Sequence, residues 1–222
     1  MIVSVTPGDV VCLSETWLLD RTDESSLQIN GFKLHTVNVG HGKGLATYFR
    51  EDKFSHSLDV KGNFEQLTKL SSKHVDVISV YRSKEGNLKL LTDQILNILT
   101  PDKTTIVCGD FNVCLRTNRQ NILSGRLEYS GFSQLVQHAT HIQGGIIDHV
   151  YVKPGEVEYM VDISLYSPYY TAFDHDALLV TLEDLEDVSV KADNLEEQQC
   201  CERFVRQIAK TRREAKESKS GS

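Results

Sequence analysis

The chain has 222 residues, of which 40% are hydrophobic and 25% are charged, and this composition is typical of one sizeable α/β domain with a tail. No apolar run is long enough to span a membrane and the first residues do not form a signal peptide, so we expect an intracellular protein, nuclear or cytoplasmic, with no membrane partner. With 31 acidic and 24 basic residues the net charge is −7, which is unusual for a protein that grips nucleic acid by neutralising phosphates.

Short apolar runs that are rich in β-branched residues and bounded by turn residues predict six buried strands. In chain order these runs are 10–13, 45–49, 75–81, 105–108, 146–152 and 177–182. A helix is predicted over 88–99, because its apolar positions fall on one face and Pro101 ends it, and a weaker helix is predicted over 127–136. The pattern indicates a mixed α/β sheet system with covering helices.

The composition changes near residue 185. Residues 183–187 are acidic, and from residue 194 the chain has few apolar positions among many charges. We therefore expect a folded domain over 1–185 and a charged tail over 186–222 that is either helical or disordered. A partner-binding role for 194–218 is one interpretation, and a simple solvated helix is the other. Five cysteines without zinc-like spacing argue against a disulfide framework or a zinc site.

The segment Cys108-Gly109-Asp110-Phe111-Asn112 follows a predicted buried strand. Ligands of open α/β sheets bind where strands emerge into loops, and residues two apart on extended chain point to the same side. Asp110 would supply an anion that holds a water or polarises it, and Asn112 a neutral donor for a phosphoryl oxygen. The same residues are also turn formers, so an ordinary turn is the alternative.

Other strand ends carry polar residues with related chemistry. Glu15 follows the strand at 10–13 and is a reasonable ligand for a hard cation such as Mg²⁺, although a lone glutamate is more often a surface residue. Tyr81 ends a strand with a phenol that could bind a phosphoryl oxygen, or it is only the polar edge of the core. Asp148, inside an apolar strand, needs a partner, and His175 supplies an imidazole that an acid would orient.

Two neighbouring features are less specific. Strand alternation turns His149 away from Asp148, so we interpret it as structural. Arg116, Arg119 and Arg126 cluster after the central motif and form either a local basic surface for phosphates or a solvated face.

Seven ordered blocks of this sequence resemble the endonuclease/exonuclease/phosphatase superfamily, and most of all the apurinic-endonuclease-like domains of non-LTR (LINE-type) retrotransposons. The blocks are Ser14-Glu15-Thr16-Trp17-Leu18, Gly42-Lys43-Gly44-Leu45-Ala46, Tyr81-Arg82, Gly109-Asp110-Phe111-Asn112, Gln134-Leu135-Val136 with Thr140-His141, Ile147-Asp148-His149-Val150 and Asp174-His175. They cover residues 10–182, and the first and fifth point to the retroelement branch.

The resemblance implies a four-layer α/β sandwich of two mixed sheets with outer helices. It also implies Mg²⁺- or Mn²⁺-dependent hydrolysis of a DNA phosphodiester that leaves a 3′-hydroxyl. The roles it implies are metal binding for Glu15 with Asp174 beside the metal, water orientation for Asp110, phosphate contacts for Asn112, Tyr81 and Thr140, and an acid–imidazole pair for Asp148 and His175.

Two departures from the family pattern leave other readings open. The family begins with an asparagine-bearing strand that we expect to be missing here, and Phe173 stands where a small hydroxyl residue is usual. A catalytically impaired remnant that serves at most as an interaction module is therefore one alternative. A small-molecule or lipid phosphatase of the same superfamily, slightly favoured by the acidic charge, is another.

Overall fold

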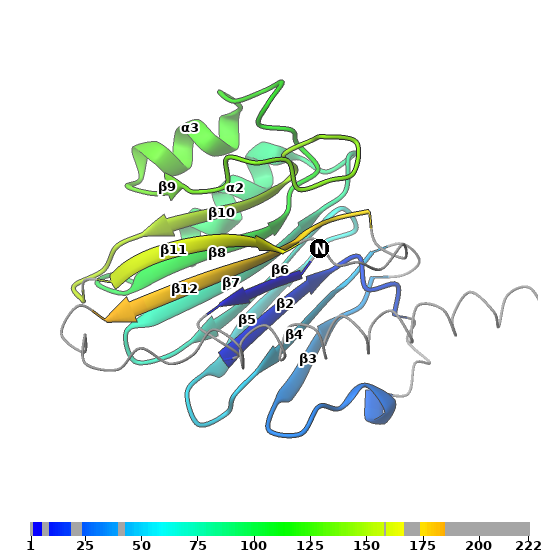
Figure 1. Ribbon diagram of the computed structural model, residues 1–222, viewed down its shortest axis with the longest axis vertical. Helices are drawn as coiled ribbons and strands as arrows, with labels where there is room; N and C mark the ends of the chain where they lie inside the picture. The colour runs from blue at the N-terminus through cyan, green and yellow to red at the C-terminus, as the bar shows by residue number, and fades with distance from the viewer. Residues whose placement is uncertain are drawn as a thin grey trace, which may run out of the picture.

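Two six-stranded mixed sheets face each other in the computed structural model, which describes residues 2–5, 9–18, 24–39, 43–157, 159–166 and 174–184 (Figure 1). The first sheet has the order β11-β12-β1-β2-β4-β3 and contains β1 Ile2–Val5, β2 Val10–Ser14, β3 Lys33–Val37, β4 Leu45–Phe49, β11 Tyr159–Tyr166 and β12 Ala177–Asp184. The second has the order β5-β6-β7-β8-β10-β9 and contains β5 Ser55–Lys61, β6 Glu65–Ser71, β7 Val75–Arg82, β8 Thr104–Asp110, β9 Ser133–Gln134 and β10 Asp148–Lys153.

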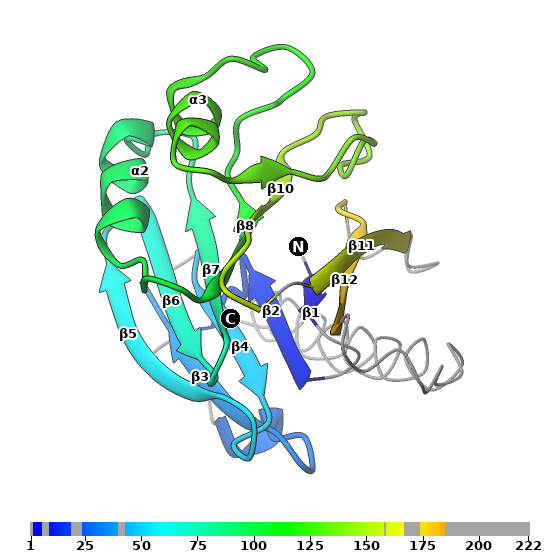
Figure 2. The same cartoon turned by 90° about the vertical axis from the view of Figure 1, so that its left-hand side faces the viewer.

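The two sheets lie face to face (Figure 2), and the main core fills the space between them. Val10, Cys12 and Phe49 of the first sheet pack there with Ile106 and Cys108 of the second. Strands β7 and β8 are buried along their whole length, because their other face packs against helices. Burial on both faces explains why these strands appear in the sequence as continuous apolar runs.

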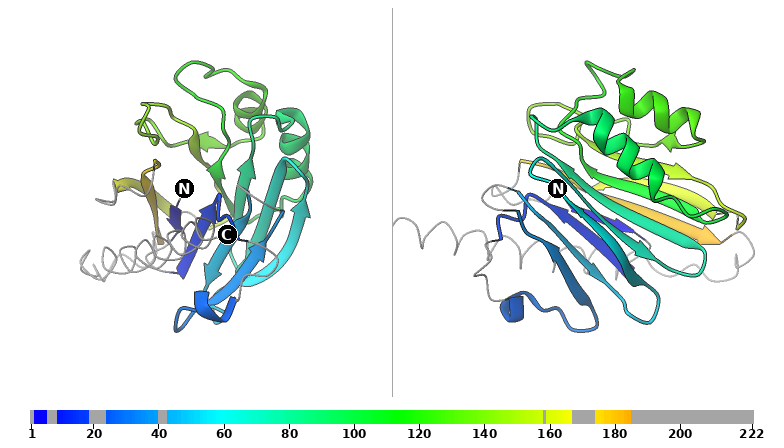
Figure 3. Two further views of the ribbon diagram at one scale, coloured as in Figure 1. Left: turned by 90° about the vertical axis from the view of Figure 1, so that its right-hand side faces the viewer. Right: turned by 180° about the vertical axis from the view of Figure 1, so that it is seen from behind.

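Two α-helices, α2 at Leu88–Asn97 and α3 at Ile122–Tyr129, cover the outer face of the second sheet (Figure 3). The Asn87 side chain caps α2 by accepting hydrogen bonds from the amides of residues 89 and 90, and Asn121 caps α3 in the same way. The prediction for 88–99 is confirmed. The predicted helix over 127–136 is wrong, because α3 ends before Gly131, whose φ of 89° suits a chain reversal, and β9 follows.

The outer face of the first sheet is packed by the 3₁₀ segment η1 at Glu24–Leu27 and its neighbours. Within the described ranges, α-helices cover only the second sheet, so three of the four predicted layers are present there. No helix in these ranges is long and apolar enough to cross a membrane. The predicted tail at 186–222, with its candidate partner-binding segment 194–218, lies outside the described residues.

The expected gap in the first sheet is not there. Strand β1 lies between β2 and β12, antiparallel to the first and parallel to the second, and pairs with both along its whole length. The backbone groups of β2 and β12 that face this position are therefore paired with β1, contrary to our expectation of a missing strand. Ile2–Val5 contains no asparagine, so this strand does not supply the amide that the family pattern places there.

Most of the functional positions predicted from strand ends lie at one end of the sandwich. β2, β7 and β8 finish there with Ser14, Arg82 and Asp110, and β10 and β12 begin there with Asp148 and Ala177. Short loops after these strands hold the residues of the candidate site.

Candidate active site

Two buried aspartates from neighbouring strands form the centre of the site. Asp110 on β8 and Asp148 on β10 are register partners in an antiparallel pair, and their exposed fractions are 1% and 0%. Burial and the charge of Asp148 raise the pKa of Asp110 to about 7. The ionised form of Asp110 is therefore disfavoured by burial and by the neighbouring carboxylate.

Asn112 is held against Asp110 by the turn that follows β8. The backbone amide of Asn112 donates to Asp110 Oδ1 at 2.9 Å, and its side-chain Nδ2 donates to Asp110 Oδ2 at 3.1 Å. The φ of Asn112 is 49°, in the left-handed region that asparagine tolerates better than most residues. The two residues act as one unit at the strand end.

Arg82 fixes this turn from the adjacent strand. Its Nε donates to the Phe111 carbonyl oxygen at 2.7 Å and its second terminal nitrogen to the Asn112 carbonyl oxygen at 3.0 Å. Arg82 is 6% exposed and is thus a positioning residue for the Asp110 loop. Arg82 is part of the Tyr81-Arg82 motif, but the sequence did not predict its role. Its acceptors are backbone carbonyl oxygens, which every residue has, so the residue pattern does not indicate them.

Asp148 pairs with His175 as predicted from the isolated acid in its strand. His175 Nδ1 lies 2.8 Å from Asp148 Oδ2 and 3.0 Å from Oδ1. Burial lowers the pKa of His175, but the hydrogen bond with Asp148 outweighs it and the pKa is raised above its ordinary value. The bond to Nδ1 leaves Nε2 of the ring as the nitrogen available to a substrate.

Asp174 and His141 surround the same imidazole. Asp174 Oδ1 lies 4.0 Å from His175 Nε2, and Asp174 Oδ2 lies 3.7 Å from His141 Nε2. Burial opposes the shift, yet its own backbone amide and the two imidazoles lower the pKa of Asp174. His141 packs edge-on against His175 at a centroid distance of 4.9 Å. The sequence named His141 only as the neighbour of Thr140, and nothing in its spacing indicated this contact.

Glu15 joins the site through Tyr81. The Tyr81 hydroxyl donates to Glu15 Oε1 at 3.1 Å, and the Tyr81 Cα is the register partner of Asp110 across β7 and β8. Burial, followed by the charge of Glu15, raises the pKa of Tyr81 well above its usual range, so the phenol stays protonated. A continuous series of neighbours therefore runs from Glu15 through Tyr81, Asp110 and Asp148 to His175.

Thr140 lies behind this series and is completely buried. Its hydroxyl oxygen accepts hydrogen bonds from the amides of Ile147 at 3.3 Å and Asp148 at 3.2 Å. Its carbonyl accepts from the amide of Asp176, next to His175, at 2.8 Å. These contacts give Thr140 a role in positioning the acid–imidazole pair, and the predicted phosphate contact stays a prediction.

His149 has the structural role that strand alternation predicts. It is fully buried, its Nε2 donates to the Val113 carbonyl oxygen at 2.9 Å, and burial lowers its pKa to about 4. Its ring therefore stays neutral and stacks on Phe111. Phe173, the predicted departure beside Asp174, lies outside the described residues.

A groove of about 690 Å³ lies beside the strand ends that carry the candidate site, between α3 and the segment that leads to Thr140. Its lining includes Arg116, Arg119, Gln134 and Gln137, but none of the residues from Glu15 to His175 in the series above. Arg116 is exposed and reaches the Gly144 turn of the loop that carries Thr140 and His141. The groove is therefore distinct from the candidate site.

The model of the endonuclease/exonuclease/phosphatase family matches residues 2–163. The chain belongs to this family. An AP endonuclease from Archaeoglobus fulgidus has a similar structure, with a TM-score of 0.60, 13% identity, and coverage of 82% of this chain and 99% of that one. A 3′ phosphatase from Neisseria bound to a product DNA hairpin has a TM-score of 0.58 and 15% identity, and the match covers 83% of this chain and 99% of that one. The human nocturnin catalytic domain with bound sulfate has a TM-score of 0.55 and 15% identity, and the match covers 79% of this chain and 81% of that one.

At these identities the solved structures establish the fold of the family for this chain. A search of curated proteins gave no match.

Members of the family typically depend on a divalent metal, and the site has donors of the type that such a metal takes. Asp110 and Asp148 lie with His175, and Asp174 with His141 and His175, in two groups whose ligand atoms are within 4.8 Å of one another. Glu15, Asp110, Asp148 and Asp174 offer carboxylate oxygens, which Mg²⁺ and Mn²⁺ prefer. Burial, followed by the charge of Asp148, raises the pKa of Asp110, and a bound cation would favour the ionised carboxylate. Glu15 and Asp174, the two ligands expected from the resemblance, lie at the two ends of the series, next to Tyr81 and His175.

Proposed function

We propose that the protein is a DNA endonuclease of the kind found in non-LTR retrotransposons, which hydrolyses one strand in the presence of Mg²⁺ or Mn²⁺ and leaves a 3′-hydroxyl. The observation that carries the proposal is the unbroken series of neighbours from Glu15 to His175 at one end of the sandwich. A protein with this activity on chromosomal DNA would act in the nucleus.

In the proposed reaction a water oxygen attacks the phosphorus and the bond from phosphorus to the 3′ oxygen breaks. Asp110, whose pKa lies at about 7, orients this water and accepts its proton. The 3′ oxygen leaves and takes a proton from solvent water, so the upstream strand ends in a 3′-hydroxyl and the phosphate stays as the 5′-phosphate of the downstream strand. Bound Mg²⁺, held by Glu15 and Asp174, would polarise a phosphoryl oxygen and offset its charge.

The remaining residues hold the phosphate. The His175 imidazole, oriented by Asp148 at Nδ1, donates from Nε2 to a phosphoryl oxygen as negative charge develops there. The Tyr81 hydroxyl and the Asn112 amide are the proposed neutral donors for the other oxygens, and they do not compete with the carboxylates for the cation. To donate to substrate, Tyr81 gives up its hydrogen bond to Glu15, and Asn112 gives up one of its bonds to Asp110 and the Arg82 carbonyl oxygen. The protonated state of Tyr81 suits this role.

DNA is the proposed substrate because the groove beside the site carries Arg116 and Arg119 in a chain whose overall charge is −7. A local pair of arginines supplies the phosphate contacts that the whole protein's charge does not. The retroelement assignment rests on the motifs Ser14-Glu15-Thr16-Trp17-Leu18 and Gln134-Leu135-Val136 with Thr140.

The test is nicking of supercoiled plasmid by the purified full chain with and without Mg²⁺. We expect nicks with 3′-hydroxyl ends that a polymerase extends, and a loss of about 10²- to 10⁴-fold in rate for Asp110→Asn. Asp52→Asn, at an exposed aspartate in the β4–β5 turn, is the matched control and should keep the wild-type rate.

Other outcomes select the alternatives. If neither the wild type nor Asp110→Asn nicks the plasmid, the result would favour a catalytically impaired remnant that only binds partners. Hydrolysis of phosphorylated inositol or sphingomyelin without DNA cleavage would favour a small-molecule or lipid phosphatase.

A further inference from the structure

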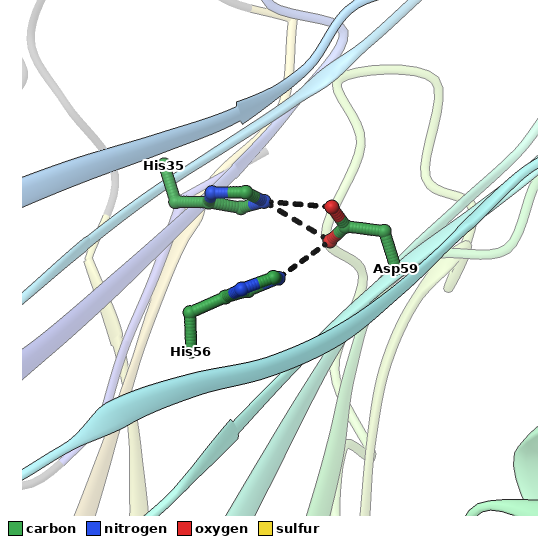
Figure 4. A group of neighbouring side chains, drawn as sticks. All are labelled: His35, His56 and Asp59. Atoms are coloured by element: carbon green, nitrogen blue, oxygen red, sulfur yellow. Dashed lines mark hydrogen bonds and ion pairs between the residues drawn. The ribbon is translucent and has the colours of Figure 1, made fainter.

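His35, His56 and Asp59 meet where the edge strands of the two sheets approach each other (Figure 4). His35 is on β3, the edge of the first sheet, and the other two are on β5, the edge of the second. His35 Nε2 lies 2.9 Å from Asp59 Oδ2, and His56 Nε2 lies 3.1 Å from Asp59 Oδ1. Three potential metal ligands from two sheets thus converge on one point.

A β-bulge makes this convergence possible. His56 and Asp59 are three apart, and on a regular strand residues three apart point to opposite faces. The pairing of β5 with β6 shifts register between His56 and Leu58, which inserts one extra residue and brings both side chains to the same side. The geometry of the cluster is thus built into the strand and does not depend on free rotation of surface side chains.

The donor atoms have the chemistry and spacing of a zinc-class site. All three ligand atoms lie within 4.8 Å of one another. Around a tetrahedral Zn²⁺ with ligand bonds of about 2.0–2.2 Å, donor atoms are about 3.3 Å apart, close to the present nitrogen–oxygen separations of 2.9 to 3.1 Å. The two imidazole rings stack with centroids 3.9 Å apart, and both present Nε2 to the carboxylate (Figure 4).

A buried residue orients the carboxylate from behind. The Thr68 hydroxyl on β6 donates to Asp59 Oδ1 at 2.7 Å, and Thr68 is 1% exposed. Hydrogen bonds of this kind fix the orientation of the side chains that bind the ion in metal sites. The side chains of His35, His56 and Asp59 are 25%, 32% and 30% exposed, so a cation and a completing water have access.

We propose that His35, His56 and Asp59 bind a divalent transition-metal cation of the zinc class, which cross-links the edges of the two sheets at a site separate from the active site. Imidazole ligands select such a cation over Mg²⁺. The bound ion takes two nitrogens and one carboxylate from the protein and completes its shell with water.

The experiment is a calorimetric titration of the full chain with Zn²⁺. It is made in a His175→Gln background, because two further groups contain His175 and could take the same ion, one with His141 and Asp174 and one with Asp110 and Asp148. We expect one equivalent to bind through the proposed site, with at least a hundredfold loss of affinity on adding His35→Gln or His56→Gln. Thr68→Val should weaken binding by about 10- to 100-fold. His138→Gln, at an exposed histidine outside all three groups, is the matched control.

A second measurement on the wild type separates ligation from an indirect effect on folding. Zn²⁺ should move the Nε2 resonances of His35 and His56 in ¹⁵N-edited spectra, while an equal concentration of Mg²⁺ leaves them in place. Equal Zn²⁺ affinity in the His35→Gln, His56→Gln and His138→Gln chains, or unmoved His35 and His56 resonances at saturating Zn²⁺, would overturn the proposal.

Discussion

Asp110 and Asp148 face each other across β8 and β10 as register partners, and both are almost completely buried. Two carboxylates in this position cannot both ionise without cost, because burial removes water from them and each repels the other. The consequence is visible at Asp110, whose pKa rises to about 7, while Asp148 is paired with the imidazole of His175.

This pair gives the metal-free protein a specific pH dependence. The folded pKa values of Asp110 and His175 are both raised, so each group adds stability at low pH that is lost as pH rises through its folded pKa. His149 has a lowered pKa and acts in the opposite direction, mostly below its unfolded value of 6.5. We therefore expect the free energy of unfolding in chelator to fall by on the order of 1 kcal/mol between about pH 6.5 and 8.

Urea unfolding across this range measures the effect. Asp110→Asn should flatten the slope and Asp52→Asn should keep it, since residue 52 is exposed and far along the chain from both aspartates. If the free energy of unfolding in chelator rises between about pH 6.5 and 8, the raised pKa values of Asp110 and His175 are contradicted.

The acid–imidazole pair makes a prediction for catalysis. His175→Gln removes the ring that Asp148 orients, so nicking in Mg²⁺ should slow by about 10²- to 10⁴-fold with little change in DNA affinity. The control is His138→Gln, at an exposed histidine. Single-turnover kinetics separate the chemical step from binding, and a weaker Kd with an unchanged chemical rate would assign His175 to binding alone.

Thr140 distinguishes positioning from contact with substrate. Thr140→Val keeps the shape but leaves the amides of Ile147 and Asp148 without the hydroxyl oxygen that they share, and an unsatisfied buried amide costs about 1–3 kcal/mol. Thermal and urea unfolding should show this loss, and Thr140→Ser should restore most of the stability. If the valine variant unfolds like the wild type and only its activity falls, Thr140 acts on the substrate and not on the fold.

Gly109 tests why the central motif begins with glycine. Its φ is 156°, and a Cβ at this position would overlap the carbonyl oxygen and carbonyl carbon of Val80 on β7. Backbone cannot retreat as a flexible side chain can, so Gly109→Ala should destabilise the protein by more than about 4 kcal/mol or prevent folding. Expression and the unfolding midpoint measure it. Gly125→Ala is the matched control, because its added Cβ meets nothing within 4 Å.

The sequence predicted the parts of the fold in which local pattern and burial agree. β7, β8 and α2 are apolar runs or faces with clear ends, and they were found. β5 and β6 were missed because Ser55–Lys61 and Glu65–Ser71 carry many polar residues. The polar side chains of β6 find partners that the sequence does not show, as when the Lys69 ammonium pairs with Asp76 at 2.7 Å.

The residues of the candidate site also fall into those that the sequence predicted and those that it did not. Asp110, Asn112, Asp148 and His175 stand at strand ends or need a partner, so reasoning from residue chemistry found them. Arg82 and His141 act through backbone carbonyls and ring packing, and such contacts depend on tertiary structure alone. The His35 cluster was hidden because it requires two sheets and a bulge.

The groove residues Arg116 and Arg119 make a prediction about DNA binding. If both contact phosphates, Arg116→Gln with Arg119→Gln should weaken binding to any sequence and lower the slope of log K against log salt by about 1.8, because each phosphate contact contributes about 0.9. Binding measured by fluorescence anisotropy over a series of salt concentrations gives the slope. Arg50→Gln, at an exposed arginine directly after β4 and outside the groove, should leave it unchanged. An unaltered slope in the double variant would show that DNA does not follow this groove.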